Sequence, residues 1–237
     1  MLDVVVRLAR PLERGDDVQA RSRVSAAGQA ANVAAWAVEL GAQARLVSKR
    51  ADDLAGRLTA AELERRGVEL KGPVVEGRTG IVASIVGPDG ERSLASDRGV
   101  SAELRSDELD DAWFDCDLLH VSGYALAAAR RPPLARRLSV DLASWTAIEE
   151  FGPRLFRERL AALEPDVVFA GRREFAALGG DVPGAEVVRK WELPRTAPAG
   201  IDSTGAGDAF AAGFLVGGLE LGLVAAARCV EQLGAMP

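Results

Sequence analysis

Histidine and cysteine are scarce in this chain of 237 residues, which contains one histidine and two cysteines. Cys116 and Cys229 lack the C-x-x-C spacing of a metal or redox site, and two cysteines are too few for a disulfide scaffold. His120 lies in an apolar run that predicts a strand, so we interpret it as a core histidine with satisfied hydrogen bonds. With one histidine, the sequence gives little support for a histidine-based zinc site or a Ser-His-Asp triad.

Long apolar runs and an excess of basic residues are also missing. No stretch approaches the roughly 20 apolar residues of a membrane span, and the N-terminus lacks the charged-then-apolar order of a signal peptide. The 29 basic residues are outnumbered by 35 acidic ones, for a net charge of −6. Nucleic-acid binding depends on positive charge that contacts the phosphates, so the net charge of the whole chain does not support it. We expect a soluble cytoplasmic protein with no membrane and no nucleic-acid partner.

The composition is globular, with 48% hydrophobic residues, and fits one sizeable α/β domain. In the second half of the chain, short apolar runs alternate with helical patterns, which is typical of βαβ units and a parallel sheet buried on both faces. The four runs cover residues 117–121, 138–142, 166–170 and 185–188. A hairpin predicted over 79–96, with its turn at 87–90, lies outside that sheet.

Helical patterns occur in both halves of the chain. An apolar stripe predicts a helix over 30–40, and Asp52 or Asp53 is positioned to cap a second helix that ends near Arg66. Two helices rich in small residues are predicted over 206–219 and 221–233. Two connections, 127–138 and 190–202, look too short for what they must hold, and we hypothesise that segments are missing near 129–137 and 190–191.

The segment Gly205-Ala206-Gly207 leads directly into the first of these C-terminal helices. Unpaired N–H groups at the positive end of a helix dipole attract anions, and small side chains let a phosphate approach the backbone. Asp208 then places a carboxylate beside the same amides, where it can take a proton from an attacking hydroxyl. This pattern indicates phosphoryl transfer; the alternative is a tight turn followed by an ordinary acidic residue of the first helical turn.

Other phosphate-binding motifs fit less well. The chain has no G-x-x-x-x-G-K-[ST], which excludes a P-loop. The run that begins at Gly205 starts like G-x-G-x-x-G, but Phe210 stands at its last position and no clear apolar strand precedes it. A dinucleotide-binding oxidoreductase is therefore a weak interpretation.

Residues 202–210, D-S-T-G-A-G-D-A-F, resemble the D-[ST]-T-G-A-G-D-[AS]-F signature of the ribokinase-like (PfkB) carbohydrate kinases. Residues 28–34, G-Q-A-A-N-V-A, followed by Leu40-Gly41, are similar to the N-terminal motif of that family, G-G-x-x-x-N-x-A…L-G. The resemblance implies an α/β fold: a ribokinase-like three-layer sandwich with a mostly parallel central sheet and a small β-sheet lid. It implies a single kinase domain over residues 1–237, with lid strands from about 8–25 and 72–98.

The resemblance also implies roles for individual residues. Asp208 matches the catalytic base, and Gly205, Ala206 and Gly207 match the anion hole for the transferred phosphate of ATP. ATP binding is implied for Thr204, Gly205, Gly207 and Glu174. Glu174 matches the glutamate of the N-x-x-E motif that organises Mg²⁺ through water, and Asp202 matches a position that helps to bind a monovalent cation such as K⁺.

Five further positions match residues that contact the sugar. They are Asp3, Gly28, Gln29, Asn32 and Arg98. Asn32 has the alternative role of satisfying backbone groups at the start of its helix, and Arg98 has the alternative of an ordinary solvated arginine.

Three departures from the family pattern stand out. Ala27 replaces the first glycine of the G-G pair, and Gly171 replaces the asparagine of N-x-x-E. The G-x-x-G nucleotide turn expected after the 185–189 strand is missing. These changes affect the predicted magnesium and nucleotide contacts but not Asp208.

The sequence therefore predicts an ATP-dependent sugar kinase that transfers the γ-phosphate to a sugar hydroxyl. A nucleoside kinase of the adenosine type is one alternative, although the charged residues 8–25 suit a purine poorly. A non-catalytic sugar- or nucleotide-binding regulator on the same fold is the other. Exposed lid strands could pair across a homodimer.

Overall fold

The computed structural model of the chain describes residues 1–90, 92–193 and 203–237. Its contacts divide the chain into two compact units, Met1–Glu103 with Arg195–Pro237, and Leu104–Pro194. The predicted single kinase domain over residues 1–237 stays a prediction.

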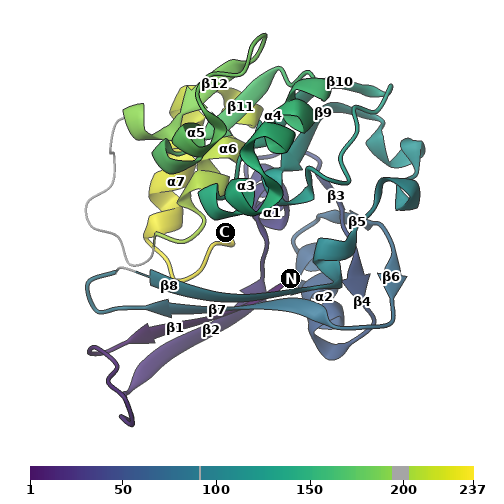
Figure 1. The fold of residues 1–237 in the computed structure, drawn as a ribbon. Coiled ribbons are helices and arrows are strands. Elements are labelled where there is room, and N and C mark those ends of the chain that lie inside the picture. Colours follow the sequence, from purple (N-terminus) through teal and green to yellow (C-terminus); the bar gives the residue numbers. More distant parts are fainter. Residues whose placement is uncertain (91, 194–202) are drawn as a thin grey trace. The chain divides into compact units, whose positions relative to one another are not determined.

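The first unit contains a four-stranded sheet in the order β2-β1-β7-β8 (Figure 1). Its strands are β1 (Leu2–Leu8), β2 (Ala20–Ala26), β7 (Thr79–Val86) and β8 (Arg92–Gly99). β1 runs antiparallel to β2 and parallel to β7, and β7 and β8 form the predicted hairpin. Two antiparallel pairs thus meet through one parallel pair, and the sheet holds the strands expected for the lid. β2 and β8 are its edge strands, and pairing through them across a dimer stays a prediction.

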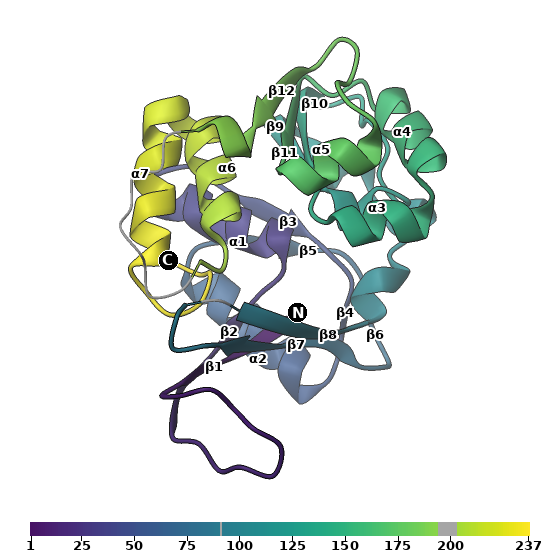
Figure 2. The same cartoon turned by 60° about the vertical axis from the view of Figure 1, so that its left-hand side comes forward.

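Four helices complete the first unit. They are α1 (Gln29–Glu39), α2 (Leu54–Arg65), α6 (Ala206–Gly217) and α7 (Leu219–Val230). Figure 2 shows α6 and α7 side by side, with α1 next to α6. The helices predicted from the apolar stripes are confirmed to within a few residues. Asp53 caps α2 as predicted: its carboxylate accepts hydrogen bonds from the amides of Gly56 (2.7 Å) and Thr79 (2.9 Å), which joins the helix start to β7.

Short parallel pairs and one buried cluster complete this unit. β3 (Arg45–Val47) pairs with β5 (Glu69–Lys71), and β4 (Arg50–Ala51) pairs with β6 (Val74–Val75). One buried cluster joins α1, α2 and the C-terminal segment, and includes Ala31, Ala35, Leu46, Leu63, Val68 and Met236.

The second unit contains a parallel sheet in the order β12-β11-β10-β9. Its strands are β9 (Cys116–Ser122), β10 (Ala135–Asp141), β11 (Val167–Ala170) and β12 (Glu186–Arg189). All four predicted apolar runs are therefore strands, and β11 is buried along its whole length. Three helices pack against one another in this unit: α3 (Trp145–Phe151), α4 (Pro153–Ala162) and α5 (Arg172–Leu178). Short 3₁₀ turns cover Ser106–Glu108, Asp111–Phe114, Gly123–Ala125 and Lys190–Glu192 in this unit, and a further one covers Val100–Glu103 in the first unit.

The chain runs continuously through both connections that looked too short, as far as the structure describes them. Between β9 and β10 the only regular element is the 3₁₀ turn Gly123–Ala125, so this crossover joins two parallel strands without an α-helix. Residues 190 and 191 continue directly from β12 into a 3₁₀ turn. The hypothesis of segments missing near 129–137 and 190–191 stays a prediction. Residues 194–202 of the second connection lie outside the described part of the chain.

His120 lies in β9 at the predicted strand. Its Nδ1 is 2.9 Å from Ser139 Oγ, and its ring packs edge-on against Phe169. The residue as a whole keeps some exposed surface, but its Nε2 is buried and has no hydrogen-bond partner among the described residues. Burial lowers the pKa of His120 to about 4; nearby Asp141 opposes this shift and Lys190 adds to it. His120 thus lies in the predicted strand, but the expectation that its hydrogen bonds are satisfied holds for Nδ1 and not, among the described residues, for Nε2.

Neither cysteine forms a disulfide in the described part of the chain; Cys229 is fully buried and Cys116 partly so. In the described part of the chain, no helix is long and apolar enough to cross a membrane.

Candidate active site

The turn before α6 has the geometry that the glycine motif predicts. Gly205 is the N-cap residue of α6 and adopts the left-handed conformation, with φ 78°. A Cβ at this position would lie 2.4 Å from the Cβ of Ala235. Glycine is therefore required twice over, by the backbone conformation and by the close approach of the C-terminal segment.

The amides of this turn are partly available for an anion. The carbonyl of Gly205 accepts the amides of Asp208 (3.0 Å) and Ala209 (2.9 Å), which starts the helix. The amide of Ala206 points at the carbonyl of Ser203, at 3.4 Å. Among the residues that the structure describes, the amides of Gly205 and Gly207 make no backbone hydrogen bond. Two donors thus remain at the positive end of a 12-residue helix, an arrangement that favours a bound anion.

Asp208 lies in the first turn of α6, and a residue from the other predicted motif holds it. The Nδ2 atom of Asn32, in α1, donates a hydrogen bond of 2.7 Å to Asp208 Oδ2. Since a carboxylate only accepts, this contact fixes which end of the Asn32 amide faces Asp208. Asn32 is buried, and its Oδ1 has no partner among the described residues. One buried acceptor is therefore left for a donor that the described residues do not supply.

Gly28 and Gln29 lie one turn before Asn32, at the start of α1. Gly28 is the N-cap residue, with φ 106°, and its carbonyl accepts the amide of Asn32 at 2.9 Å. Gln29 is the first helical residue and is partly exposed. Ala27, which stands where the family has glycine, is buried and donates its amide to the carbonyl of Met1 at 2.9 Å. The backbone turn at Gly28 thus forms with alanine before it.

Asp3 lies in the middle of the sheet of the first unit. It is 3% exposed, and its Oδ1 accepts a hydrogen bond of 2.8 Å from Ser84 Oγ on β7, which is fully buried. Sequence reasoning missed Ser84, which stands in an apolar strand. Arg98, by contrast, is an exposed residue near the end of β8.

The C-terminal segment supports the Gly205 turn, a role that sequence reasoning also missed. The indole Nε1 of Trp36 donates to the carbonyl of Ala235 at 2.8 Å, and Arg23 Nη1 donates to the carbonyl of Leu233 at 2.7 Å. The Sγ of Cys229 contacts the carbonyl of Thr204 at 3.3 Å, and Thr204 is buried. Thr204, just before the turn, is thus held by α7. The C-terminal segment that packs on Gly205 is held by α1 and β2.

Glu174 and Asp202 are the two predicted metal-site residues. Glu174 lies in the first turn of α5, in the second unit, where a Cβ on Gly171 would lie 2.2 Å from its Oε2. Glycine at 171 thus leaves room for that carboxylate beside the backbone. Asp202 lies outside the described residues. Within the described ranges, no group of three or more His, Cys, Asp or Glu side chains could hold a metal ion.

Residues 3–189 match the pfkB family of carbohydrate kinases. This chain belongs to that family. The match covers more than half of the chain and makes the protein a phosphotransferase with a sugar hydroxyl as acceptor. An ATP-dependent ribose-1-phosphate kinase of Halopiger xanaduensis is 34% identical over 243 residues, which cover 90% of this chain and 80% of that protein.

Solved structures share the fold of this pfkB-family protein. Adenosine kinase from Sinorhizobium meliloti superposes with a TM-score of 0.78 at 22% identity, over 100% of this chain and 93% of that one. Ribokinase from Thermotoga maritima gives a TM-score of 0.74 at 20% identity, over 100% and 93%. The predicted ribokinase-like fold is confirmed, and identities this low show the fold alone.

Proposed function

We propose that this pfkB-family protein is an ATP-dependent sugar kinase in which Asp208 is the general base. The observation that carries the proposal is the hydrogen bond from Asn32 to Asp208, which fixes a carboxylate beside the amides at the start of α6. A base must be held at the reacting hydroxyl, and an anion site must accept the charge of the transferring group.

The proposed reaction balances as follows. The oxygen of the acceptor hydroxyl forms a bond to the γ-phosphorus of ATP, while the bond from that phosphorus to the β,γ-bridging oxygen breaks and ADP leaves. Asp208 takes the hydroxyl proton. The amides of Gly205 and Gly207 bind the transferring phosphate, and Ala206 and Thr204 shape the turn that presents them. Because charge spreads over the phosphate oxygens in the transition state, these donors stabilise it.

Asp3, Gly28, Gln29, Asn32 and Arg98 are proposed to bind the acceptor. Asp3 and Asn32 are the best supported, since both are buried and polar in the same unit as Asp208. The unpartnered Oδ1 of Asn32 can accept a hydrogen bond from a sugar hydroxyl. Lid strands that hold Asp3 and Arg98 fit a substrate that is covered during transfer.

Mg²⁺ is proposed to bind with ATP. In phosphoryl-transfer sites it typically takes one or two carboxylates together with substrate phosphates, rather than a cage of protein ligands, and this chain offers no such cage among its described residues. Glu174 would hold it through water, and the ion would neutralise charge on the phosphates. Binding of K⁺ near Asp202 is a further proposal that follows from the signature.

Two other functions remain to be separated from this one. A nucleoside as acceptor stays an alternative, and the named substrate of the Halopiger xanaduensis relative favours a sugar. Gly171 and the missing G-x-x-G turn favour a non-catalytic binding protein.

ADP formation from MgATP, measured with a panel of sugars, sugar phosphates and nucleosides, distinguishes the three functions. We expect turnover that depends on a sugar or sugar phosphate. Turnover with adenosine alone would identify a nucleoside kinase. Binding of acceptor without turnover across the panel would identify a non-catalytic protein.

A further inference from the structure

We propose that the acceptor of this kinase carries a phosphate group of its own, and that Arg7 and Arg21 bind that group. The inference rests on the proposed function, since it names the class of acceptor for the same site. It is carried by a cross-strand pair of arginines and by the cavity that they line.

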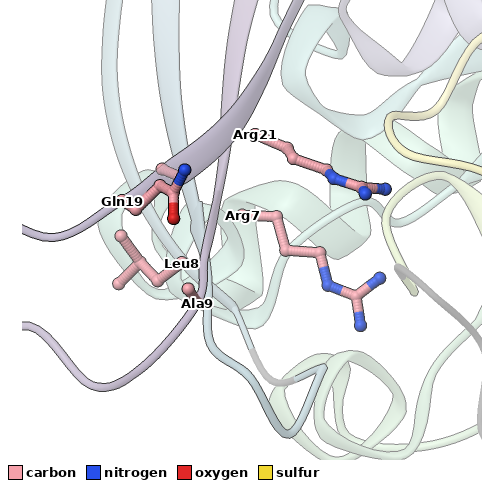
Figure 3. Close-up of a pocket in the computed structure, with 6 residues that line it drawn as sticks. Arg7, Leu8, Ala9, Gln19 and Arg21 are labelled. Carbon is pink, nitrogen blue, oxygen red and sulfur yellow. The ribbon is translucent and has the colours of Figure 1, made fainter.

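Arg7 and Arg21 are direct cross-strand partners in the β1–β2 pair. Directly opposite residues have their Cβ atoms about 5 Å apart, and like charges in such a pair repel each other. Figure 3 shows both guanidinium groups extending to the same side of the two strands. Repulsion between these two positive charges destabilises the fold. An anion bound between them would offset this repulsion.

Neither arginine is neutralised by the protein in the part of the chain that the structure describes. Neighbouring arginines do have acidic partners: Arg10 pairs with Asp16, and Arg78 with Asp97. Arg7 and Arg21 make no ion pair with any described carboxylate. Their donors are therefore available in a geometry that suits a phosphate, which guanidinium groups bind in a bidentate manner.

The two arginines line a cavity of about 340 Å³, together with Leu8, Ala9, Gln19 and Ala20 (Figure 3). This volume is at the lower end of the range for small-ligand sites. It suits a phosphate with part of a sugar better than a whole nucleoside triphosphate. All of the lining residues except Arg7 belong to residues 8–25, and Arg21 is the charged one among them.

The arginine pair lies on the face of the sheet that leads to the Gly205 turn. Side chains at alternate positions share a face, so Asp3, Val5 and Arg7 lie together on β1, opposite Ser25, Arg23 and Arg21 on β2. On this face, Arg23 donates a hydrogen bond to the carbonyl of Leu233. The next residue, Gly234, packs on the same face, because a Cβ there would contact Val5, Arg23 and Ser25. The following residue, Ala235, packs on Gly205.

This face therefore carries, in order along the strands, the buried Asp3, the C-terminal segment beside Gly205, and then the arginine pair. Along β1, Arg7 lies two residues from Val5, about 7 Å, and four residues from Asp3, about 13 Å. A sugar phosphate can thus hold its phosphate at the arginines while a hydroxyl at its other end is available for phosphorylation. The proposed acceptor is thus a sugar phosphate that is phosphorylated at a hydroxyl remote from the phosphate it already carries.

The test compares Arg7→Gln, Arg21→Gln and the double variant with the full-length wild-type protein. Arg78→Gln is the matched control, because Arg78 belongs to the same sheet region but pairs with Asp97. Binding of ribose 1-phosphate and of ribose is measured by titration calorimetry without ATP, and KM and kcat are measured with MgATP.

We expect wild-type protein to bind ribose 1-phosphate at least 10-fold more tightly than ribose. Each single variant should weaken ribose 1-phosphate binding about 10-fold and the double variant about 100-fold, with ribose binding and the control unchanged; two to three hydrogen bonds to a charged group account for losses of this size. Arg→Lys variants should recover part of the binding, since they keep the charge.

Equal wild-type affinity for ribose and ribose 1-phosphate, or unchanged ribose 1-phosphate binding in the double variant, would overturn the proposal. Failure of the proposed function looks different: no acceptor would be phosphorylated by wild-type protein, while the calorimetry would still show whether the arginines bind the phosphate.

Discussion

Asn32 on α1 and Asp208 on α6 are joined by a hydrogen bond of 2.7 Å, although 176 positions separate them in the chain. The bond connects the two segments that carry the family motifs. It fixes one oxygen of the Asp208 carboxylate at the start of α6. Asn32 is thus a positioning residue for Asp208 as well as a candidate contact for the acceptor.

Replacing Asn32 with Ala should lower kcat about 100-fold, since a misplacement of about 1 Å can cost this much. The KM for ATP should change little, because Asn32 does not belong to the turn before α6. Steady-state kinetics with thermal unfolding as the control for folding would check this. A rise in the KM for ATP together with an unchanged kcat would contradict the positioning role.

Gly205→Ala should reduce both stability and activity, since the new Cβ would lie 2.4 Å from Ala235 and the residue has φ 78°. Gly179→Ala is the matched control: Gly179, at the end of α5, is also left-handed, with φ 85° and ψ 24°, but the nearest atom to its Cβ position is Arg157 Nη1 at 3.9 Å, an ordinary van der Waals distance. The control should lose about 1–2 kcal/mol from the left-handed conformation alone, and Gly205→Ala should lose more. Equal losses of unfolding free energy would show that Ala235 does not restrain the turn.

Ser84→Ala should leave the buried Asp3 Oδ1 without the hydroxyl that now bonds to it at 2.8 Å. We expect a loss of about 1 kcal/mol in unfolding free energy, the typical net contribution of one buried hydrogen bond. The KM for the acceptor should rise while the KM for ATP stays constant, because Asp3 is proposed to bind the acceptor. Ser93→Ala, at an exposed position on the neighbouring strand β8, should change neither quantity.

His120 should make stability depend on pH in the second unit. Its pKa is lowered to about 4 in the folded protein by burial, whereas an unfolded chain has the ordinary value near 6.5. Between these values the unfolded chain binds a proton that the folded one does not, so the unfolding free energy falls as the pH is lowered from 6.5 towards 4.

The expected loss between pH 7 and pH 5 is on the order of 2 kcal/mol. Chemical denaturation of wild type and His120→Gln at both pH values would measure it, with glutamine able to keep a hydrogen bond to Ser139. The variant should lose this part of the pH dependence. The same difference between the two pH values in both proteins would show that His120 does not titrate in this way.

The sequence predicted those elements whose cause is local. The stripe of α1, the Asp53 cap of α2 and the four apolar strands of the second unit follow from periodicity and capping chemistry. The glycine turn before α6 was predicted for the same reason, because a left-handed residue at a helix start favours glycine.

The contacts that assemble the candidate site were not predictable in this way. The pairing of Arg7 with Arg21 and the bond from Ser84 to Asp3 depend on strand register, which joins residues far apart in the chain. Ala235 packs on Gly205 from a segment that has no periodic pattern. The crossover from β9 to β10 without a helix also went against expectation, because the usual βαβ unit is only a tendency.

The most direct test of the account is the rate of phosphoryl transfer from MgATP to the best acceptor of the panel, measured for wild type and Asp208→Asn. Asparagine keeps the size of the side chain but cannot take up the proton, so kcat should fall by about 10²–10⁴-fold. Acceptor binding measured by calorimetry should stay within a few-fold of wild type. A near-normal kcat in Asp208→Asn would contradict the claim that this carboxylate activates the acceptor.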